Sequence, residues 1–426
     1  MALTDVQMAI VKSTAPVLKE HGNTITACFY KSLLGTHPEL KNIFSLRNQQ
    51  TGAQQAALAN SVLAYATYID DLPKLTHAVE RIAHKHASLF VKPEQYPIVG
   101  HHLMQAIAEV LGPALTPEIA DAWTAAYGQL ADLFIQKEQA LYDASGAPPQ
   151  WRRFKIVRKE KESESVTSFY LEPSDGVTPL PKYLPGQYLS VQIPIPELDN
   201  LNQSRQYSLS EAQPADRSHY RVSVKREATD PDATPEDIGA GKVPGLVSNR
   251  LHDDFNVGDE LELSHPQGEF CVDVTDASKA TAPLVMLSAG VGATPLLSIL
   301  ESVLGAGSSM ADRPVSWIQA SSSSRHACFA ARIRQLAHEK DNISTKLFLD
   351  QVGEGDVKGE THDFASPLDL SALDAAKDLY TGDGGAEYFV CGPIGWMLSV
   401  RSELEGMGVS RERMHLELFG TGDVPQ

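Results

Sequence analysis

The chain is 426 residues long, which is more than one hydrophobic core usually organises, so two or three domains are expected. Hydrophobic residues make up 42% and charged residues 21%, a balance typical of a globular protein, and no apolar run reaches the length of a membrane span. The formal net charge of −18 argues against polyanionic partners such as nucleic acid or acidic membrane surfaces.

The cysteines and the first residues indicate a cellular setting. Four cysteines lie far apart and lack the spacing of a zinc site, which favours reduced thiols over a disulfide framework. Residues 1–5 show no basic segment ahead of an apolar core. Together these features predict a cytoplasmic protein without a membrane span.

The first third of the chain, residues 3–142, carries a helical pattern almost throughout, with one helix beginning after Pro117. Within it, one apolar stripe recurs at helical spacing and ends in a histidine. We expect this His86 to point inward, either as a hydrogen-bonded core residue or as a metal ligand. His84 falls on a polar stripe and is expected to face solvent. The stripe residues are Val79, Ile82, Ala83 and His86.

A glycine and paired prolines at 145–150 end the last helix, and the pattern then changes to strands, so a domain boundary is expected there. Residues 151–280 alternate with period 2 between turn residues, which predicts a small antiparallel barrel. The acidic, proline-containing segment 227–237 has no periodicity and is predicted to be a surface loop.

The stretch Arg205-Gln206-Tyr207-Ser208 lies between two predicted strands, 188–193 and 220–225. On a strand edge, an arginine can meet a phosphate, an aromatic ring can cover an isoalloxazine, and a hydroxyl can reach the ring nitrogens. This pattern therefore indicates a flavin site, although the same residue types also occur on solvated strand faces.

A second candidate phosphate site lies further along the predicted barrel. Gly245, Val247 and Ser248 belong to a glycine turn that opens a helix. The free backbone N–H groups at such a helix start suit a diphosphate. A diphosphate site inside the barrel favours FAD over FMN.

The last third of the chain predicts a nucleotide-binding domain. A buried strand at 284–289 is followed by Gly290-Val291-Gly292-Ala293-Thr294-Pro295 and then by a helical pattern. A glycine turn with Thr294 as the N-cap and Pro295 at the first helical position forms a phosphate-binding helix start.

Further strands alternate with helices, which predicts a parallel sheet. Cys391-Gly392-Pro393 ends one of these strands at its carboxyl end, the edge where such sheets bind ligands. The segment 321–325 follows another strand, at the position where such domains bind the adenosine ribose. Its serines and Arg325 could bind the 2′-phosphate of NADPH. Alternatively, the segment is an ordinary polar loop and the protein prefers NADH. The predicted strands are 315–320, 345–349 and 387–391.

The helical segment resembles the globin domain of the flavohaemoglobin family. The stretches that carry this likeness are 42–44, 81–86, 92–96, 121–123 and 126–128. The resemblance implies that His86 is the proximal iron ligand of haem b, that Lys85 beside it contacts the cofactor, and that Phe44 packs on the porphyrin.

The same resemblance assigns residues to both sides of the iron. Tyr30 and Gln54 would donate hydrogen bonds to iron-bound dioxygen, and Leu58 would restrict access for larger ligands. Tyr96 and Glu138 would form a hydrogen-bond network with the proximal histidine, which makes that ligand more electron-rich.

The remaining chain resembles the reductase module of that family, because Arg205 to Ser208 match the Arg-x-Tyr-Ser motif of the ferredoxin–NADP reductase superfamily. By this likeness Tyr188 would be a second aromatic on the flavin, and Cys391-Gly392-Pro393 would lie beside the nicotinamide. Glu417 and Phe419 match residues near the flavin face that the nicotinamide must reach. The residues expected to bind phosphate groups are Gly245, Val247 and Ser248 for FAD and Gly290 to Pro295 for NADH or NADPH, with NADH expected to be preferred.

The resemblance covers essentially the whole chain and implies three domains: an all-α globin haem domain at 1–147, an antiparallel β-barrel FAD domain at 148–280 and an α/β parallel-sheet NAD(P)H domain at 281–426. The implied activity is that of a nitric oxide dioxygenase. NAD(P)H reduces FAD, FAD reduces haem, and haem-bound dioxygen oxidises nitric oxide to nitrate, which detoxifies nitric oxide under nitrosative stress. We expect a monomer whose small-molecule substrates are dioxygen and nitric oxide. The alternatives are a sensor of these gases, or a haem peroxidase or alkyl-hydroperoxide reductase that uses the same relay.

Overall fold

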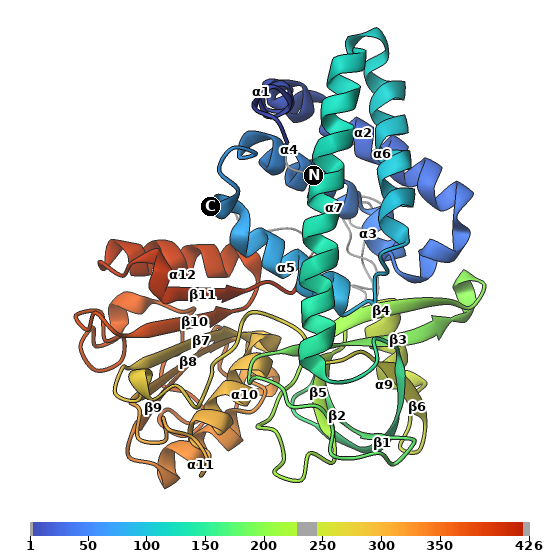
Figure 1. The fold of residues 1–426 in the computed structure, drawn as a ribbon. Helices are drawn as coiled ribbons and strands as arrows, with labels where there is room; N and C mark the ends of the chain where they lie inside the picture. Colours follow the sequence, from blue (N-terminus) through green and yellow to red (C-terminus); the bar gives the residue numbers. More distant parts are fainter. Residues whose placement is uncertain (1–2, 228–244, 421–426) are drawn as a thin grey trace.

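The computed structural model describes residues 3–227 and 245–420, and these form a helical domain above a barrel and a parallel sheet (Figure 1). Most of the segment 227–237, predicted to be a surface loop, lies outside the described residues. Among the helices of the described ranges, none combines the length and the hydropathy needed to cross a membrane.

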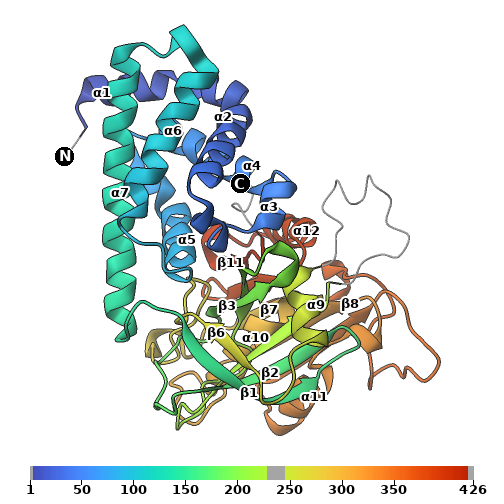
Figure 2. The same ribbon diagram turned by 90° about the vertical axis from the view of Figure 1, so that its right-hand side faces the viewer.

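The helical domain surrounds a core of aliphatic and aromatic side chains, including Phe29, Leu33 and Trp123. Helix α7 runs along the height of the domain and ends beside the barrel (Figure 1). Helix α5 lies at the base of the domain, where it faces the barrel (Figure 2). The helices are α1 (Asp5–Ser13), α2 (Ala15–Thr36), α3 (Leu46–Gln50), α4 (Ala53–Thr67), α5 (Thr76–Ala87), α6 (Gln95–Leu111) and α7 (Pro117–Ser145).

Helix α7 has clear start and stop signals in the sequence. Thr116 is its N-cap, with a side chain that accepts a hydrogen bond from the N–H of Ile119, and Pro117 occupies the first helical position. Gly146 ends the helix with a φ of 65°, a left-handed conformation that glycine adopts without strain. The predicted start after Pro117 is therefore confirmed to within one residue.

The second domain is an antiparallel sheet with the strand order β4-β3-β6-β1-β2-β5. Its two outer strands approach each other, because Leu209 and Val222 form an isolated bridge and the N–H of Ser210 donates to the carbonyl of Arg221 at 3.0 Å. The sheet thus curls into a barrel. The strands are β1 (Arg152–Lys161), β2 (Val166–Pro173), β3 (Tyr188–Ile195), β4 (Leu201–Ser208), β5 (Tyr220–Lys225) and β6 (Glu260–Leu263). Helix α9 (Leu246–Asp253) lies between β5 and β6 along the chain.

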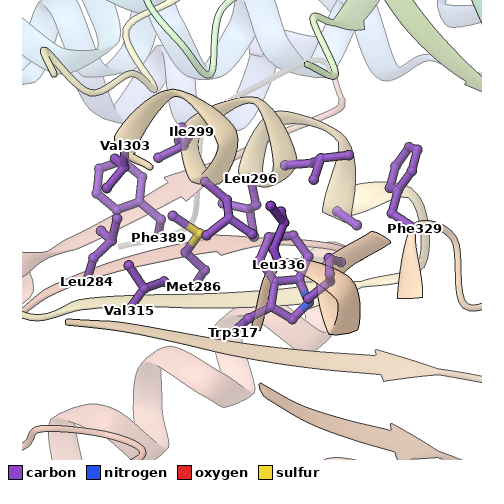
Figure 3. Packing of buried hydrophobic residues seen from close by; sticks show 14 of the residues in the cluster. Leu284, Met286, Leu296, Ile299, Val303, Val315, Trp317, Phe329, Leu336 and Phe389 are labelled. Carbon is purple, nitrogen blue, oxygen red and sulfur yellow. The ribbon is translucent and has the colours of Figure 1, made fainter. Parts of the chain in front are cut away.

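The third domain is a parallel sheet of order β11-β10-β7-β8-β9 with helices on both faces. Alternate residues of β7 point to opposite faces: Met286 packs under α10 beside Trp317 (Figure 3), whereas Leu287 packs with Met397 of α12. The elements are β7 (Leu284–Ala289), α10 (Ala293–Val303), β8 (Val315–Ser321), α11 (Ala330–Glu339), β9 (Ile343–Leu349), β10 (Glu387–Cys391), α12 (Ile394–Gly406) and β11 (Met414–Glu417).

The predicted helix start at Thr294 is wrong in detail. A 3-10 turn at Gly290–Gly292 leads directly into α10, so Gly292 is the N-cap and Thr294 is already the second helical residue. Because Thr294 already lies inside the helix, its hydroxyl donates to the carbonyl of Val291 at 2.9 Å and caps no N–H group. Pro295 is the third helical residue. Its missing N–H costs no hydrogen bond, because the first four N–H groups of a helix have no partner within the helix.

Gly100 lets α6 and α7 approach each other closely, and replacing it tests this packing. An added Cβ would lie 2.8 Å from Cδ1 of Tyr127 and closer still to Cε1. Overpacking costs about 1–3 kcal/mol, against about 1 kcal/mol gained when alanine replaces glycine in a helix. We expect Gly100→Ala to lower the thermal midpoint of the helical domain, measured by circular dichroism. The matched control is Gly128→Ala at an exposed position of α7, where an added Cβ meets nothing within 4 Å, and it should leave or raise the midpoint. Equal midpoints in the two variants would contradict this packing.

Candidate functional site

The inward histidine of α5 is held by a buried carboxylate. His86 Nδ1 lies 2.8 Å from Oε1 of Glu138 and 3.0 Å from the hydroxyl oxygen of Tyr96. The Tyr96 hydroxyl donates to the same Glu138 oxygen at 2.5 Å, and Glu138 is only 2% exposed. Three elements, α5, α6 and α7, therefore bring the three predicted proximal residues into one network.

This network fixes the chemical state of the histidine. A carboxylate that accepts the Nδ1–H leaves the lone pair on Nε2, the nitrogen that can ligate a metal. Burial, followed by the charge of Glu138, raises the pKa of Tyr96, so the phenol stays a proton donor. The geometry fits a haem iron held by His86.

The predicted distal residues also share one region of the helical core. Tyr30 on α2 is 5% exposed, and its ring meets Phe44 edge-on at a centroid distance of 5.5 Å. Burial raises the pKa of Tyr30, while a hydrogen bond with the side chain of Gln54 on α4 opposes that rise. Leu58 packs against the same core one turn further along α4. A cavity of about 370 Å³ borders Tyr30 and opens between α2 and the start of α4.

On the barrel, the predicted flavin stretch lies on β4 and pairs with β3, so that Tyr188 faces Ser208 across the two strands. Arg205 is partly buried, and desolvation lowers its pKa. Its guanidinium donates to the Ser204 carbonyl at 2.7 Å, and no carboxylate in the described ranges forms an ion pair with it. A desolvated guanidinium without an anionic partner suits a phosphate. Burial likewise raises the pKa of Tyr207, so its hydroxyl stays neutral.

The turn before α9 requires a glycine because neighbouring parts of the chain approach it closely. At Gly245, an added Cβ would lie 2.8 Å from Cβ of Glu227 and would overlap the Ser248 hydroxyl. Ser248 donates to the Gly245 carbonyl at 3.2 Å, and Val247 is buried in the barrel core. The role of these three positions in binding FAD stays a prediction.

The glycine turn and the Cys-Gly-Pro stretch of the third domain meet at one edge of the sheet. Strands β7 and β10 are neighbours, and a Cβ on Gly292 would overlap the carbonyl group of Cys391. Gly290 has a φ of 56°, and Gly392 lies where a Cβ would be 2.9 Å from Cβ of Ala289. Of the other predicted residues, Val291 is partly buried and Pro393 is exposed. The buried ones are Ala293, Thr294 and Pro295.

Ionisable residues from all three domains come together where these sites face one another. Lys85 of α5 donates to the side-chain oxygen of Gln206 on β4. Burial and then the charge of Arg205 lower the pKa of Lys85 to about 8, while burial and then the charge of Glu269 raise the pKa of Glu417 on β11 to about 8. Phe419, two residues further on, is 51% exposed.

The structure corrects the prediction for His84. Its Nδ1 accepts the N–H of Gly268 at 3.1 Å and lies 2.9 Å from Oε1 of Gln267, so it contacts the barrel and is only partly exposed to solvent. A second contact that was not predicted joins Arg81 Nε to Glu269 Oε1 at 3.0 Å. A polar helix stripe looks the same in sequence whether water or another domain covers it, so no signal in the chain distinguishes these cases.

Comparisons with known proteins agree with this arrangement. A family model described as Globin matches residues 15–134. Flavohemoproteins of Bordetella pertussis and Rhizobium meliloti are 46% and 43% identical over 420 and 422 residues, which is 98% of this chain and 98% of each relative. A flavohemoglobin of Malassezia yamatoensis, solved with bound FAD and heme, matches 99% of this chain and 100% of its own at a TM-score of 0.83 and 29% identity.

The reductase part has a separate match. The FAD/NAD-binding domain of a nitric oxide dioxygenase from Vibrio cholerae covers 63% of this chain and 98% of its own at a TM-score of 0.51 and 33% identity. The predicted order of folds is confirmed: a globin domain, an antiparallel FAD-binding domain and a parallel-sheet NAD-binding domain.

Replacing His86 tests its assignment as the iron ligand. We expect His86→Ala to lose haem, because no other ligand replaces the imidazole, but to keep FAD and its reduction by NADH. Haem and flavin are quantified by absorbance after extraction. His101→Ala, which removes an exposed histidine of α6, is the control and should keep full haem content. Normal haem content in His86→Ala would move the ligand to another residue.

Replacing Tyr30 tests its assignment to the distal side. Tyr30→Phe removes one hydrogen-bond donor and keeps the ring, so dioxygen should dissociate about tenfold faster, as expected for a lost hydrogen bond of about 1.4 kcal/mol. Flash photolysis or stopped-flow mixing measures that rate. Tyr65→Phe, whose hydroxyl donates to the Ala126 carbonyl at 3.0 Å, is the matched control. An unchanged rate in Tyr30→Phe would refute the distal role.

Proposed function

The chain belongs to the flavohemoprotein family, and on this basis we propose that it is a nitric oxide dioxygenase that takes electrons from NADH through FAD to haem. The observation that carries the proposal is the direct contact between α5, which bears His86, and β4, which bears Tyr207, through Lys85 and Gln206. The Vibrio cholerae protein whose reductase domain this chain resembles is described as a nitric oxide dioxygenase, which supports the same activity.

The residues of the chain have distinct parts in this proposal. When bound, NADH supplies a hydride, FAD divides it into single electrons, and haem uses them to activate dioxygen. Tyr30 and Gln54 provide the donors above the iron, and Glu138 with Tyr96 keeps His86 in the tautomer that ligates through Nε2. Arg205 and the turn at Gly245 hold the phosphates of FAD.

We assign the haem site to residues 1–147, the FAD site to 148–280 and the nucleotide site to 281–426. NADH is the preferred donor in this assignment, and NADPH is tolerated. Arg325 is exposed after β8 and could meet a 2′-phosphate, but two carboxylates lie close by. Asp356 hydrogen-bonds Ser324, and Glu164 Oε2 lies 4.0 Å from Nε2 of His326. These negative charges disfavour the additional phosphate.

A peroxidase is the second candidate, because of one specific observation. The hydrogen bonds of His86 to Glu138 and of Tyr96 to Glu138 give the proximal ligand anionic character, which a simple oxygen carrier does not require. The relay to the haem would be the same, and the substrate would be a hydroperoxide.

Steady-state turnover separates the two candidates. Haem- and FAD-replete protein is mixed with NADH, dioxygen and nitric oxide, and we expect nitrate to form as nitric oxide disappears. Each nitric oxide needs one electron from the relay, so each hydride should support two turnovers. NADPH in place of NADH should lower kcat/KM. Hydroperoxide reduction that is faster than nitrate formation would favour the peroxidase, and nitric oxide bound without nitrate would favour a sensor.

A further inference from the structure

Four residues form a closed ring of hydrogen bonds between the helical domain and the barrel. The Lys85 ammonium donates to Oε1 of Gln206, and Nε2 of Gln206 donates to Oγ of Ser190 at 2.8 Å. The Ser190 hydroxyl then donates to Oγ of Ser88 at 2.9 Å, and the Ser88 hydroxyl donates to the backbone carbonyl of Lys85 at 2.8 Å. The chain of donors thus returns to the residue where it began.

The direction of every bond in the ring is determined. An ammonium can only donate, so Gln206 must accept through its oxygen and donate through its nitrogen. The Ser190 hydroxyl then accepts one hydrogen bond and donates one, while Ser88 accepts from Ser190, donates to the Lys85 carbonyl and also hydrogen-bonds the Tyr188 side chain. Ser88 and Ser190 are both 0% exposed, so no water replaces a partner that is removed.

The ring joins the two segments that carry the candidate redox sites. Lys85 and Ser88 lie in the last turn of α5 and just after it, on either side of His86. Gln206 precedes Tyr207 on β4, and Ser190 lies opposite Gln206 on the neighbouring strand β3. The ring therefore includes the chain neighbour of His86 on one side and the chain neighbour of Tyr207 on the other.

We infer that the ring of Lys85, Gln206, Ser190 and Ser88 is a positioning element that holds the turn bearing His86 against the strand bearing Tyr207 and so sets the rate of electron transfer from flavin to haem. This inference rests on the proposed function. In each step, reduced FAD loses one electron and ferric iron gains it to become ferrous, and no bond in the ring forms or breaks. The serines are positioning residues, because they act through the separation of the two sites and touch neither reacting centre.

The test uses the full chain with haem and FAD and compares Ser88→Ala, Ser190→Ala and the double variant. Ser204→Ala is the matched control, because Ser204 lies on the same strand β4 but donates to Gln192 within the barrel at 3.3 Å. Hydrogen–deuterium exchange of the peptide 84–91 reports whether the turn is held. Anaerobic stopped-flow mixing with NADH separately follows the bleaching of the flavin and the shift of the haem Soret band.

Each single variant should raise exchange of the peptide 84–91 about tenfold, because a buried hydroxyl loses its partner. Haem reduction should slow by at least about fivefold, since small displacements of supporting groups have large effects on rate. Flavin bleaching and the resting Soret spectrum should stay unchanged. In the double variant, the exchange rate and the rate of haem reduction should change by less than the product of the two single effects. The reason is that both hydroxyls are removed together, so neither is left facing a missing partner in the other serine.

Two outcomes would overturn the inference. Exchange equal to that of Ser204→Ala would show that the ring does not hold the turn. Faster exchange with an unchanged rate of haem reduction would show that the ring does not set the rate. A parent protein whose flavin bleaches while its haem stays ferric would instead contradict the proposed function, and the exchange data alone would then decide whether the ring holds the two segments.

Discussion

Helix α5 is constrained from two sides, and the arrangement of the candidate redox sites depends on that constraint. From within the helical domain, the buried carboxylate of Glu138 fixes His86. From the barrel, Gln267, Glu269 and Gln206 contact residues of the same helix that precede His86. A helix held in this way can present one nitrogen of a histidine to a metal while its opposite face stays against a flavin site. The distance between the two sites is then a property of the fold.

Burial of charge is the second physical feature of this region. Lys85, Arg205 and Glu417 come from three different domains and lose solvent where these domains meet. Desolvation disfavours all three charges. Lys85 and Glu417 attract each other, but Lys85 and Arg205 repel, so attraction offsets only part of the desolvation. An anionic cofactor bound beside Arg205 would supply a missing counter-charge. The electrostatics of the region therefore make most sense in a protein that carries a bound flavin nucleotide.

Much of the fold was predictable because local patterns and tertiary structure agree. The apolar stripe that ends at His86 points inward, the stretch from Arg205 to Ser208 lies on a strand, and Cys391 ends a parallel strand. The assembly of Tyr96 and Glu138 around His86 could be expected only from resemblance to a family, because these residues lie far apart along the chain.

The parts that were not predicted share a cause. His84 was assigned to solvent because a polar stripe does not reveal that another domain covers it. Thr294 was assigned as a cap because the sequence does not show that a 3-10 turn already precedes the helix. Ser88 and Ser190 are ordinary serines in sequence, and their hydrogen bond exists only because two domains meet there. Contacts between domains depend on the placement of whole domains, which local propensity does not encode.

The proposed relay conducts electrons within one chain, from NADH through flavin to a haem on His86. An anaerobic absorption titration of the purified protein with NADH tests it most directly. We expect a Soret band beside flavin absorbance, and bleaching of the flavin that precedes a shift of the Soret band to the ferrous form. A flavin that bleaches in protein with no Soret band would contradict the haem assignment, and a Soret band that never shifts would contradict the relay.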